Sequence, residues 1–163
     1  MKKGIAFLLA AVIGIGSGVA LAVTLQMNDV EDNTMMPSYL EGETVLINKL
    51  SYRNEMPERG DVVVFSNQVF TATGEGELML KRVIAVAGDR VLITGGKVYV
   101  NNKPLSEDYV FSQGSSGEME EIKVIDDYVF VLGDNRADST DSRSETVGLV
   151  SSDDILGKVI FKW

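Results

Sequence analysis

Residues 78–86 read LMLKRVIAV, an apolar run that is interrupted near its centre by a lysine and an arginine. Because side chains alternate between the two faces of a strand, Lys81 is predicted to share one face with Met79 and Val83. An ammonium group on an apolar face loses hydration, which favours the neutral amine and lowers the pKa of the lysine. Such a lysine can act as a general base toward a neighbouring hydroxyl group, or its stem can cover apolar surface while its head reaches water. The segment predicts a strand and leaves both roles of Lys81 open.

Short β-branched runs separated by Gly, Asn, Asp and Ser lie on both sides of this segment. Such spacing predicts a mainly β, mostly antiparallel domain with tight turns. Gly95 and Gly96 stand between two of the runs and predict a hairpin, because glycines readily adopt the positive φ of a primed turn. Segments 68–77 and 107–121 are predicted loops. The predicted strands are Thr44–Asn48, Asp61–Phe65, Leu78–Val86, Arg90–Ile93, Lys97–Val100, Tyr128–Leu132 and Lys158–Phe161.

The N-terminal segment 4–27 contains no charged residue. As a helix it would be about 36 Å long, enough to cross a hydrocarbon core of about 30 Å. Two lysines precede it and several acidic residues follow, so the positive-inside rule places the N-terminus in the cytoplasm. A cleavable signal peptide is the alternative, because residues 20–22 (Ala-Leu-Ala) fit a small-x-small site, but the apolar run continues past them. We predict a cytoplasmic N-terminus and transmembrane anchor over residues 1–27, and a β-rich domain over residues 28–163 on the extracellular face of the cell membrane.

The composition excludes several classes of function. The formal net charge is −9, and an acidic chain repels phosphate backbones, so nucleic acid is not a predicted partner. The chain has no cysteine, which excludes disulfides, thiol nucleophiles and zinc-thiolate sites. It also has no histidine, which excludes a Ser-His-Asp triad and imidazole metal sites. Hydrolytic chemistry would therefore need a lysine or a carboxylate as its base, and no metal or other cofactor is predicted.

Residues 133–143 read GDNRADSTDSR and are dense in carboxylates and hydroxyls. A solvated polar loop is the plain interpretation of such a segment. A calcium loop is a further interpretation, although Arg136 falls where the EF-hand pattern requires a ligand.

Four segments together carry a family resemblance: TMMPS at 34–38, GDVVVF at 60–65, KRVIAVAGD at 81–89 and the segment 133–143. Their order and spacing resemble the type I signal peptidases, especially the compact Gram-positive type, over nearly the whole chain. The resemblance implies a single transmembrane helix followed by a β-barrel-like catalytic domain. It also implies a membrane-bound endopeptidase of the Ser/Lys-dyad kind, which cuts signal peptides from secreted preproteins after small-x-small motifs.

The resemblance assigns roles to individual residues. Lys81 matches the general-base lysine, Ser139 matches the serine that orients this lysine, and Thr34 stands at the nucleophile position. An extended signal peptide would lie along strand edges by β-augmentation. The matches that support the site are Asp134, Asn135, Arg136, Asp141 and Arg143, and those of the nucleophile turn and oxyanion region are Asp32, Met35 and Pro37.

Two of these positions depart from the family pattern. Thr34 replaces the nucleophilic serine, and its methyl group restricts χ1 and crowds the attacking oxygen. Asp32 lies two residues before it and offers only acceptors, which would oppose a developing negative charge if the carboxylate pointed inward. Ser38 is a substitute nucleophile only if the turn rearranges, and its capping-box pattern predicts a helix N-cap instead.

Three functions remain open on the sequence. One is an endopeptidase that uses Thr34 and Lys81 on preprotein signal peptides. Another is a non-proteolytic homologue that holds pilin subunits in an extended conformation, as an assembly factor or chaperone for surface pilins; some degenerate members of the resembled family have this role. The third is a tethered β-domain whose groove has no function.

Overall fold

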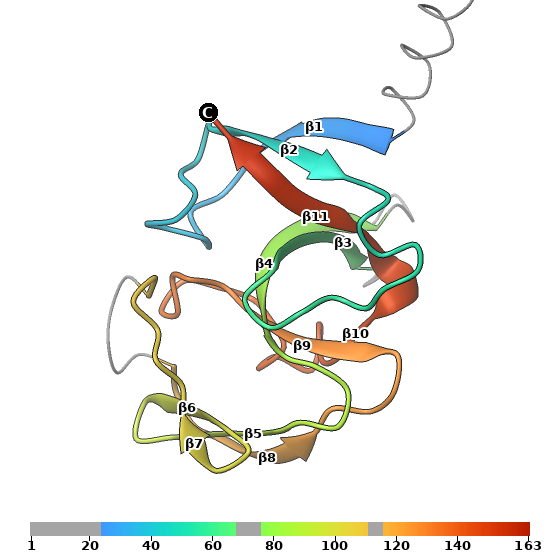
Figure 1. The fold of residues 1–163 in the computed structure, drawn as a ribbon. Coiled ribbons are helices and arrows are strands. Elements are labelled where there is room, and N and C mark those ends of the chain that lie inside the picture. Colours follow the sequence, from blue (N-terminus) through green and yellow to red (C-terminus); the bar gives the residue numbers. More distant parts are fainter. Residues whose placement is uncertain (1–23, 68–75, 111–115) are drawn as a thin grey trace, which may run out of the picture.

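The computed structural model describes residues 24–67, 76–110 and 116–163, which form two antiparallel sheets (Figure 1). The larger sheet has the strand order β1-β2-β11-β3-β4-β9-β10, and the smaller one has the order β7-β6-β5-β8. A short 3₁₀ helix, η1, leads into the last strand. The elements are β1 Leu25–Asp29, β2 Thr44–Asn48, β3 Val62–Asn67, β4 Glu77–Ala85, β5 Arg90–Thr94, β6 Lys97–Val100, β7 Lys103–Pro104, β8 Met119–Lys123, β9 Tyr128–Leu132, β10 Val150–Ser151, η1 Ser152–Asp154 and β11 Ile155–Lys162.

The larger sheet is apolar on both faces at its centre. In β3, Val62 and Val64 pack on one face with Met35, whereas Val63 and Phe65 pack on the other. This arrangement explains why the sequence of β3 is a continuous apolar run and does not alternate with polar residues. In Figure 1 the strands β3 and β4 curve strongly.

The smaller sheet begins as the predicted hairpin. Gly95 and Gly96 have φ angles of 57° and 73°, and β5 pairs with β6 from Val91↔Val100 to Thr94↔Lys97. The hairpin buries Val91 and Ile93 against Phe130 of β9, which joins this sheet to the end of the larger one.

The mainly β, antiparallel fold class is confirmed, and each predicted strand lies on a strand of the structure. The loop prediction for residues 107–121 is wrong at its C-terminal end, because β8 begins at Met119. Most side chains of this edge strand are charged. Its two apolar members, Met119 and Ile122, pack on the core but are three positions apart, so the sequence does not alternate. Residues 68–75 and 111–115 lie outside the described residues.

The prediction of an N-terminal membrane-spanning helix is wrong where it overlaps β1. Residues 25–29 form a strand that pairs with β2 from Leu25↔Asn48 to Asp29↔Thr44. Pairing with the backbone of β2 therefore decides the conformation here, and the apolar character of Leu25–Met27 does not. Within the described ranges, the structure contains no helix of the length and apolar character needed to cross a membrane. The rest of the predicted anchor, including residues 20–22, lies in residues 1–23, outside the described residues.

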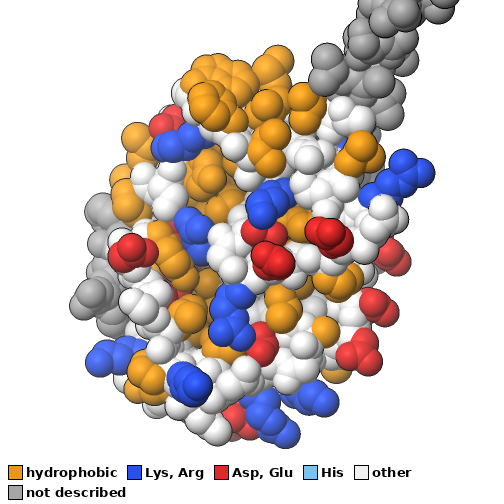
Figure 2. Space-filling view, viewed as in Figure 1, with side chains coloured by type: hydrophobic (Ala, Val, Ile, Leu, Met, Phe, Trp, Pro, Cys, Tyr) orange, Lys and Arg blue, Asp and Glu red, His pale blue; other side chains and the backbone are white. Residues whose placement is uncertain are grey.

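Apolar side chains gather on the surface around the C-terminal end of β11 (Figure 2). Phe161 and Trp163 are more than half exposed there, with ring centroids 5.8 Å apart. Lys162 lies between them in sequence and forms an ion pair with Glu43.

Gly157 is the tightest point of β11, and we predict that Gly157→Ala destabilises the fold. An added Cβ would lie 2.4 Å from the backbone oxygen of Asn48 and 2.8 Å from Cγ2 of Ile47. Relieving such overlap should lower the free energy of unfolding by about 2 kcal/mol. Urea denaturation of the full chain in detergent measures this change.

The matched control is Ile160→Ala in the same strand, where the side chain is exposed. It should cost less than about 1 kcal/mol. Equal unfolding free energies for Gly157→Ala and the unaltered chain would contradict the close packing of β11 on β2.

Candidate active site

Lys81 lies on β4 and its side chain is fully buried, with 0% exposure. It shares a face with Met79 and Val83, which are also buried, as the alternation predicted. Its Nζ donates a hydrogen bond of 2.8 Å to Oγ1 of Thr34 and one of 3.0 Å to the carbonyl oxygen of Leu80. The interpretation in which the amine reaches bulk water is therefore wrong.

Burial lowers the pKa of Lys81 below its ordinary value, because the ammonium form loses hydration. The carboxylates of Asp32, Asp141 and Glu77 oppose this effect and favour the charged form. Burial is the larger influence, so the neutral amine becomes accessible at a lower pH than in an exposed lysine.

Thr34 is held in place by its neighbours on both sides. Met35 is fully buried among the side chains of Val45 and Val64, which anchors the turn that contains the cis peptide bond Met36–Pro37. The backbone oxygen of Thr34 accepts a hydrogen bond of 2.9 Å from the backbone N–H of Asn135. The side-chain amide of Asn135 also donates to the carbonyl oxygen of Asn33 at 3.1 Å.

Asp32 is turned toward Thr34. One carboxylate oxygen, Oδ1, accepts a hydrogen bond of 3.0 Å from the backbone N–H of Thr34 and another of 2.7 Å from its hydroxyl group. Asp32 is otherwise exposed, so this contact lies at the solvent side of the site.

Arg82 supports the site from the opposite face of β4. Its guanidinium group donates two hydrogen bonds to the carboxylate of Asp134, at 2.8 and 2.6 Å, and stacks 4.1 Å from the ring centroid of Tyr109. It also donates to the carbonyl oxygen of Gly60 and to the hydroxyl of Ser38, at 3.1 and 3.3 Å. The predicted N-cap role of Ser38 is wrong, because the residues after it form a turn and a strand.

Segment 133–143 is an internally bonded support and not a solvated loop. The buried carboxylate of Asp141 accepts hydrogen bonds from the backbone N–H of Gly133 at 3.0 Å and from the Nε and Nη2 atoms of Arg143, both at 2.8 Å. Arg136 is buried as well, forms an ion pair with Glu107 and donates to the carbonyl oxygen of Gly133 at 2.9 Å. Among the described residues, no group of acidic side chains is arranged to hold a metal ion.

Ser139 lies beside this support without a partner of its own. Its Oγ is buried and has no hydrogen-bond partner among the described residues. A Cβ added at Gly133 would lie 2.2 Å from this Oγ and 2.6 Å from the carbonyl oxygen of Thr34. Glycine at 133 therefore lets the support approach the Thr34 segment closely. The predicted role of Ser139 in orienting Lys81 stays a prediction.

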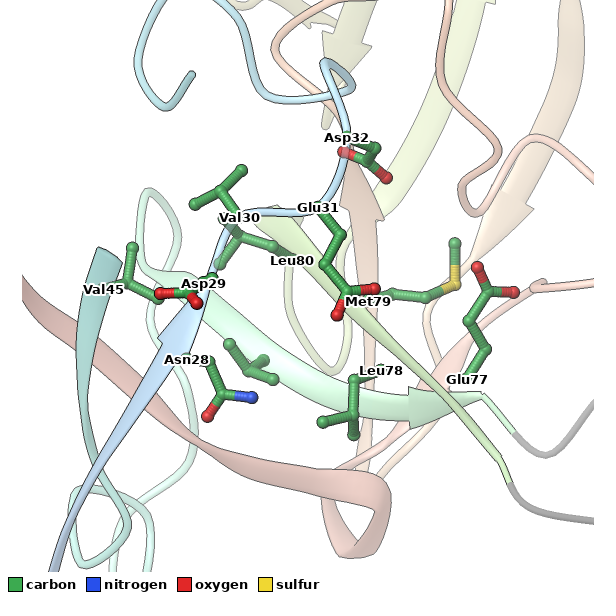
Figure 3. Close-up of a pocket in the computed structure, with 11 residues that line it drawn as sticks. Asn28, Asp29, Val30, Glu31, Asp32, Val45, Glu77, Leu78, Met79 and Leu80 are labelled. Carbon is green, nitrogen blue, oxygen red and sulfur yellow. The ribbon is translucent and has the colours of Figure 1, made fainter. Parts of the chain in front are cut away.

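A cleft of about 460 Å³ is lined by Asp32, which bonds to Thr34, and by Leu80, which precedes Lys81 (Figure 3). Residues 28–32 form one wall and residues 77–80 form the other, with Val45 and Val64 between them. The β4 wall is an open strand edge, because β9 pairs with β4 only from Arg82 onward in the described registers. This edge thus has backbone groups available to an extended chain on the part of β4 that leads up to Lys81.

Sequence reasoning missed Glu107 and Tyr109, which contact Arg136 and Arg82 respectively. Both residues lie in a segment predicted to be a loop, and nothing in the sequence indicates which distant arginine an isolated acidic or aromatic side chain will meet. The orientation of Asp32 was also left open by the sequence.

Comparison with known proteins shows that this chain is similar to signal peptidases. The family described as "Signal peptidase, peptidase S26" matches residues 2–163. The "Probable signal peptidase I-2" of Synechocystis sp. is 32% identical over 100% of this chain and 72% of its own length. The "Signal peptidase I" of Bacillus caldolyticus is 35% identical over 82% of this chain and 76% of its own. The crystal structure of a signal peptidase I from Enterococcus faecalis V583 superposes with a TM-score of 0.54 at 26% identity, covering 65% of this chain and 98% of that one.

The ion pair between Arg82 and Asp134 yields a stability prediction. Asp134 is completely buried, and Arg82 is 14% exposed, so Asp134→Ala leaves a largely buried guanidinium group without its partner. We expect a loss of about 3 kcal/mol in the free energy of unfolding. Urea denaturation of Asp134→Ala, Arg82→Met and the double variant measures the coupling.

The loss of unfolding free energy in the double variant should be smaller, by at least about 1 kcal/mol, than the sum of the losses in the two single variants. Strictly additive losses would show that the two side chains do not stabilise each other.

Proposed function

The chain belongs to the signal peptidase family, peptidase S26, and we propose that it cleaves signal peptides from preproteins with Thr34 as nucleophile and Lys81 as general base. The observation that carries the proposal is the hydrogen bond of 2.8 Å between Lys81 Nζ and Thr34 Oγ1. It joins a hydroxyl group to an amine whose pKa is lowered by burial. Among the described residues, no other hydroxyl group forms a hydrogen bond with this amine.

The proposed reaction runs through an acyl-enzyme. Neutral Lys81 accepts the hydroxyl proton of Thr34 as Oγ1 attacks the scissile carbonyl carbon. The resulting ammonium group gives that proton to the leaving amine, and the peptide bond breaks to leave an ester on Thr34. Lys81 then takes a proton from a water molecule that attacks the ester. The ammonium group gives this proton to Oγ1 of Thr34 as the bond between Oγ1 and the acyl carbon breaks, which releases the acid product and restores the hydroxyl group and the neutral amine.

The cleft supports an extended substrate. A peptide that pairs with the open edge of β4 would place alternate side chains into the cleft and alternate ones toward solvent. The cleft is partly apolar, since Val30, Val64 and Leu80 are among its lining residues. This supports the choice of small side chains at two alternate positions before the scissile bond, which is the small-x-small pattern.

A non-proteolytic role as an assembly factor for surface pilins is the second candidate. The observation that favours it is that Asp32 engages both the hydroxyl and the backbone N–H of Thr34. The same cleft would then hold an extended pilin segment without cutting it. The buried Lys81 argues for the peptidase, because burying an amine is costly and a binding groove gains nothing from it.

Cleavage of a preprotein by three detergent-solubilised forms of the full chain tests the proposal: unaltered, Thr34→Ser and Lys81→Met. Lys81→Met should lower kcat/KM at least about 100-fold, because the general base is lost while the stem is kept. Thr34→Ser should raise it about tenfold, because the crowding methyl group is removed.

Cleavage by the Lys81→Met form at the unaltered rate would remove Lys81 from the mechanism. Cleavage by Thr34→Ser alone would leave the cleft and base intact but favour the binding role for the natural chain.

The pH dependence follows from the burial of Lys81. Its pKa in the folded chain lies below the ordinary 10.5, so kcat/KM should rise with pH as the neutral base forms, with a midpoint below 10.5. Between the two pKa values the unfolded chain binds more protons, so the free energy of unfolding should also rise with pH in this window. Lys81→Met should abolish this contribution to the stability profile, and identical stability profiles with and without Lys81 would contradict the assignment.

A further inference from the structure

Asp32 and Lys81 contact the same hydroxyl group from two sides. Oγ1 of Thr34 donates to Oδ1 of Asp32 at 2.7 Å and accepts from Nζ of Lys81 at 2.8 Å. A hydroxyl group has a single proton, and in this arrangement the proton points at the carboxylate and not at the amine. General-base catalysis by Lys81 requires the opposite orientation.

The backbone N–H of Thr34 is engaged as well. Oδ1 of Asp32 accepts it at 3.0 Å. When a hydroxyl attacks a carbonyl carbon, the backbone N–H of the attacking residue is well placed to donate to the developing oxyanion. One carboxylate oxygen of Asp32 therefore binds both the backbone N–H and the hydroxyl proton of Thr34, and attack would need both groups free.

The charge of Asp32 acts in the same direction. Three carboxylates face Lys81: Asp32 from the segment after β1, Glu77 from the start of β4 and Asp141 from the segment after β9. Asp32 has the largest influence of the three and favours the ammonium form, which cannot accept a proton.

We infer that Asp32 is a positioning residue that holds the Thr34–Lys81 pair in a non-attacking arrangement until its carboxylate leaves Thr34. This inference rests on the proposed function, because it assigns a resting state to the same site. The carboxylate is exposed and lies at the end of the cleft, so a peptide carbonyl that approaches the N–H of Thr34 has to displace it toward solvent. Asp29, Glu31 and Glu77 also line the cleft, and their repulsion favours displacement outward.

Asp32→Asn and Asp32→Ala test the inference in the full chain in detergent. Asn keeps the shape but removes the charge, and Ala removes the acceptor. Because the hydroxyl proton and the N–H become available, kcat/KM should rise about tenfold in Asp32→Ala and by a smaller factor in Asp32→Asn. The midpoint of the pH–rate profile should move to lower pH in both. A merely structural role of Asp32 would not move this midpoint.

Glu31→Gln is the matched control, because it removes the same charge from the adjacent position of the cleft wall. No hydrogen bond of Glu31 to Thr34 is formed in the structure. Its effects on rate and midpoint should be smaller than those of Asp32→Asn. Equal effects would reduce the role of Asp32 to general charge and overturn the inference. Loss of cleavage in Asp32→Asn would overturn it too, since Asp32 would then assist attack.

A second measurement separates this inference from the proposed function. If no form cuts, including Thr34→Ser, the proposed function fails. NMR titration of the Lys81 amine, assigned with Lys81→Met, then decides the inference together with hydrogen exchange of the Thr34 amide. In Asp32→Ala the titration midpoint should fall and the amide should exchange faster. If both stay unchanged, Asp32 does not hold the pair and the inference is overturned.

Discussion

The burial of one amine is the constraint on which the site depends. Lys81 lies on an apolar face of β4, where an ammonium group would lose its hydration without compensation. The structure provides two oxygen acceptors within 3.0 Å, Thr34 Oγ1 and the Leu80 carbonyl, and carboxylates farther out. The segment that carries Thr34 therefore supplies one of the acceptors that compensate for the burial of Lys81. This coupling explains why residues 47 positions apart in sequence are held at hydrogen-bond distance.

The rest of the scaffold keeps these two groups aligned. Asn135 donates hydrogen bonds to the carbonyl oxygens of Asn33 and Thr34, and Gly133 has no side chain that would keep segment 133–143 away from them. Arg82 and Asp134 form a largely buried ion pair on the face of β4 opposite to Lys81. Buried ion pairs often add little net stability, because desolvation offsets their attraction. Their defined geometry can instead fix how segment 133–143 approaches β4, and with it the alignment of Thr34 with Lys81.

The sequence allowed prediction of those parts of the fold in which local pattern and tertiary environment agree. The alternation in residues 78–86 placed Lys81 on the buried face, and Gly95 and Gly96 located the hairpin between β5 and β6. It failed where pairing overrides local character: β1 continues an apolar run and β8 is mostly charged, yet each completes a sheet edge. Contacts of single side chains, such as Arg136 with Glu107, depend on the final packing and have no local signature. The motifs pointed to Thr34 and Lys81, which form a hydrogen bond with each other, whereas the direction of the Asp32 carboxylate required the structure.

The two departures from the family pattern act on the same oxygen atom. In threonine the methyl group limits χ1, so the position of Oγ1 is largely fixed once the backbone is held by Asn135. The remaining freedom is the direction of the hydroxyl proton, and two acceptors compete for it. A carboxylate is the stronger acceptor, since its charge strengthens the hydrogen bond, and it also stabilises the protonated form of its competitor. A serine could rotate its oxygen away from such a carboxylate, but a threonine has fewer rotamers in which to do so. In the proposed mechanism, the Asp32 carboxylate therefore has more influence on the reactivity of Thr34 than it would have on a serine at the same position.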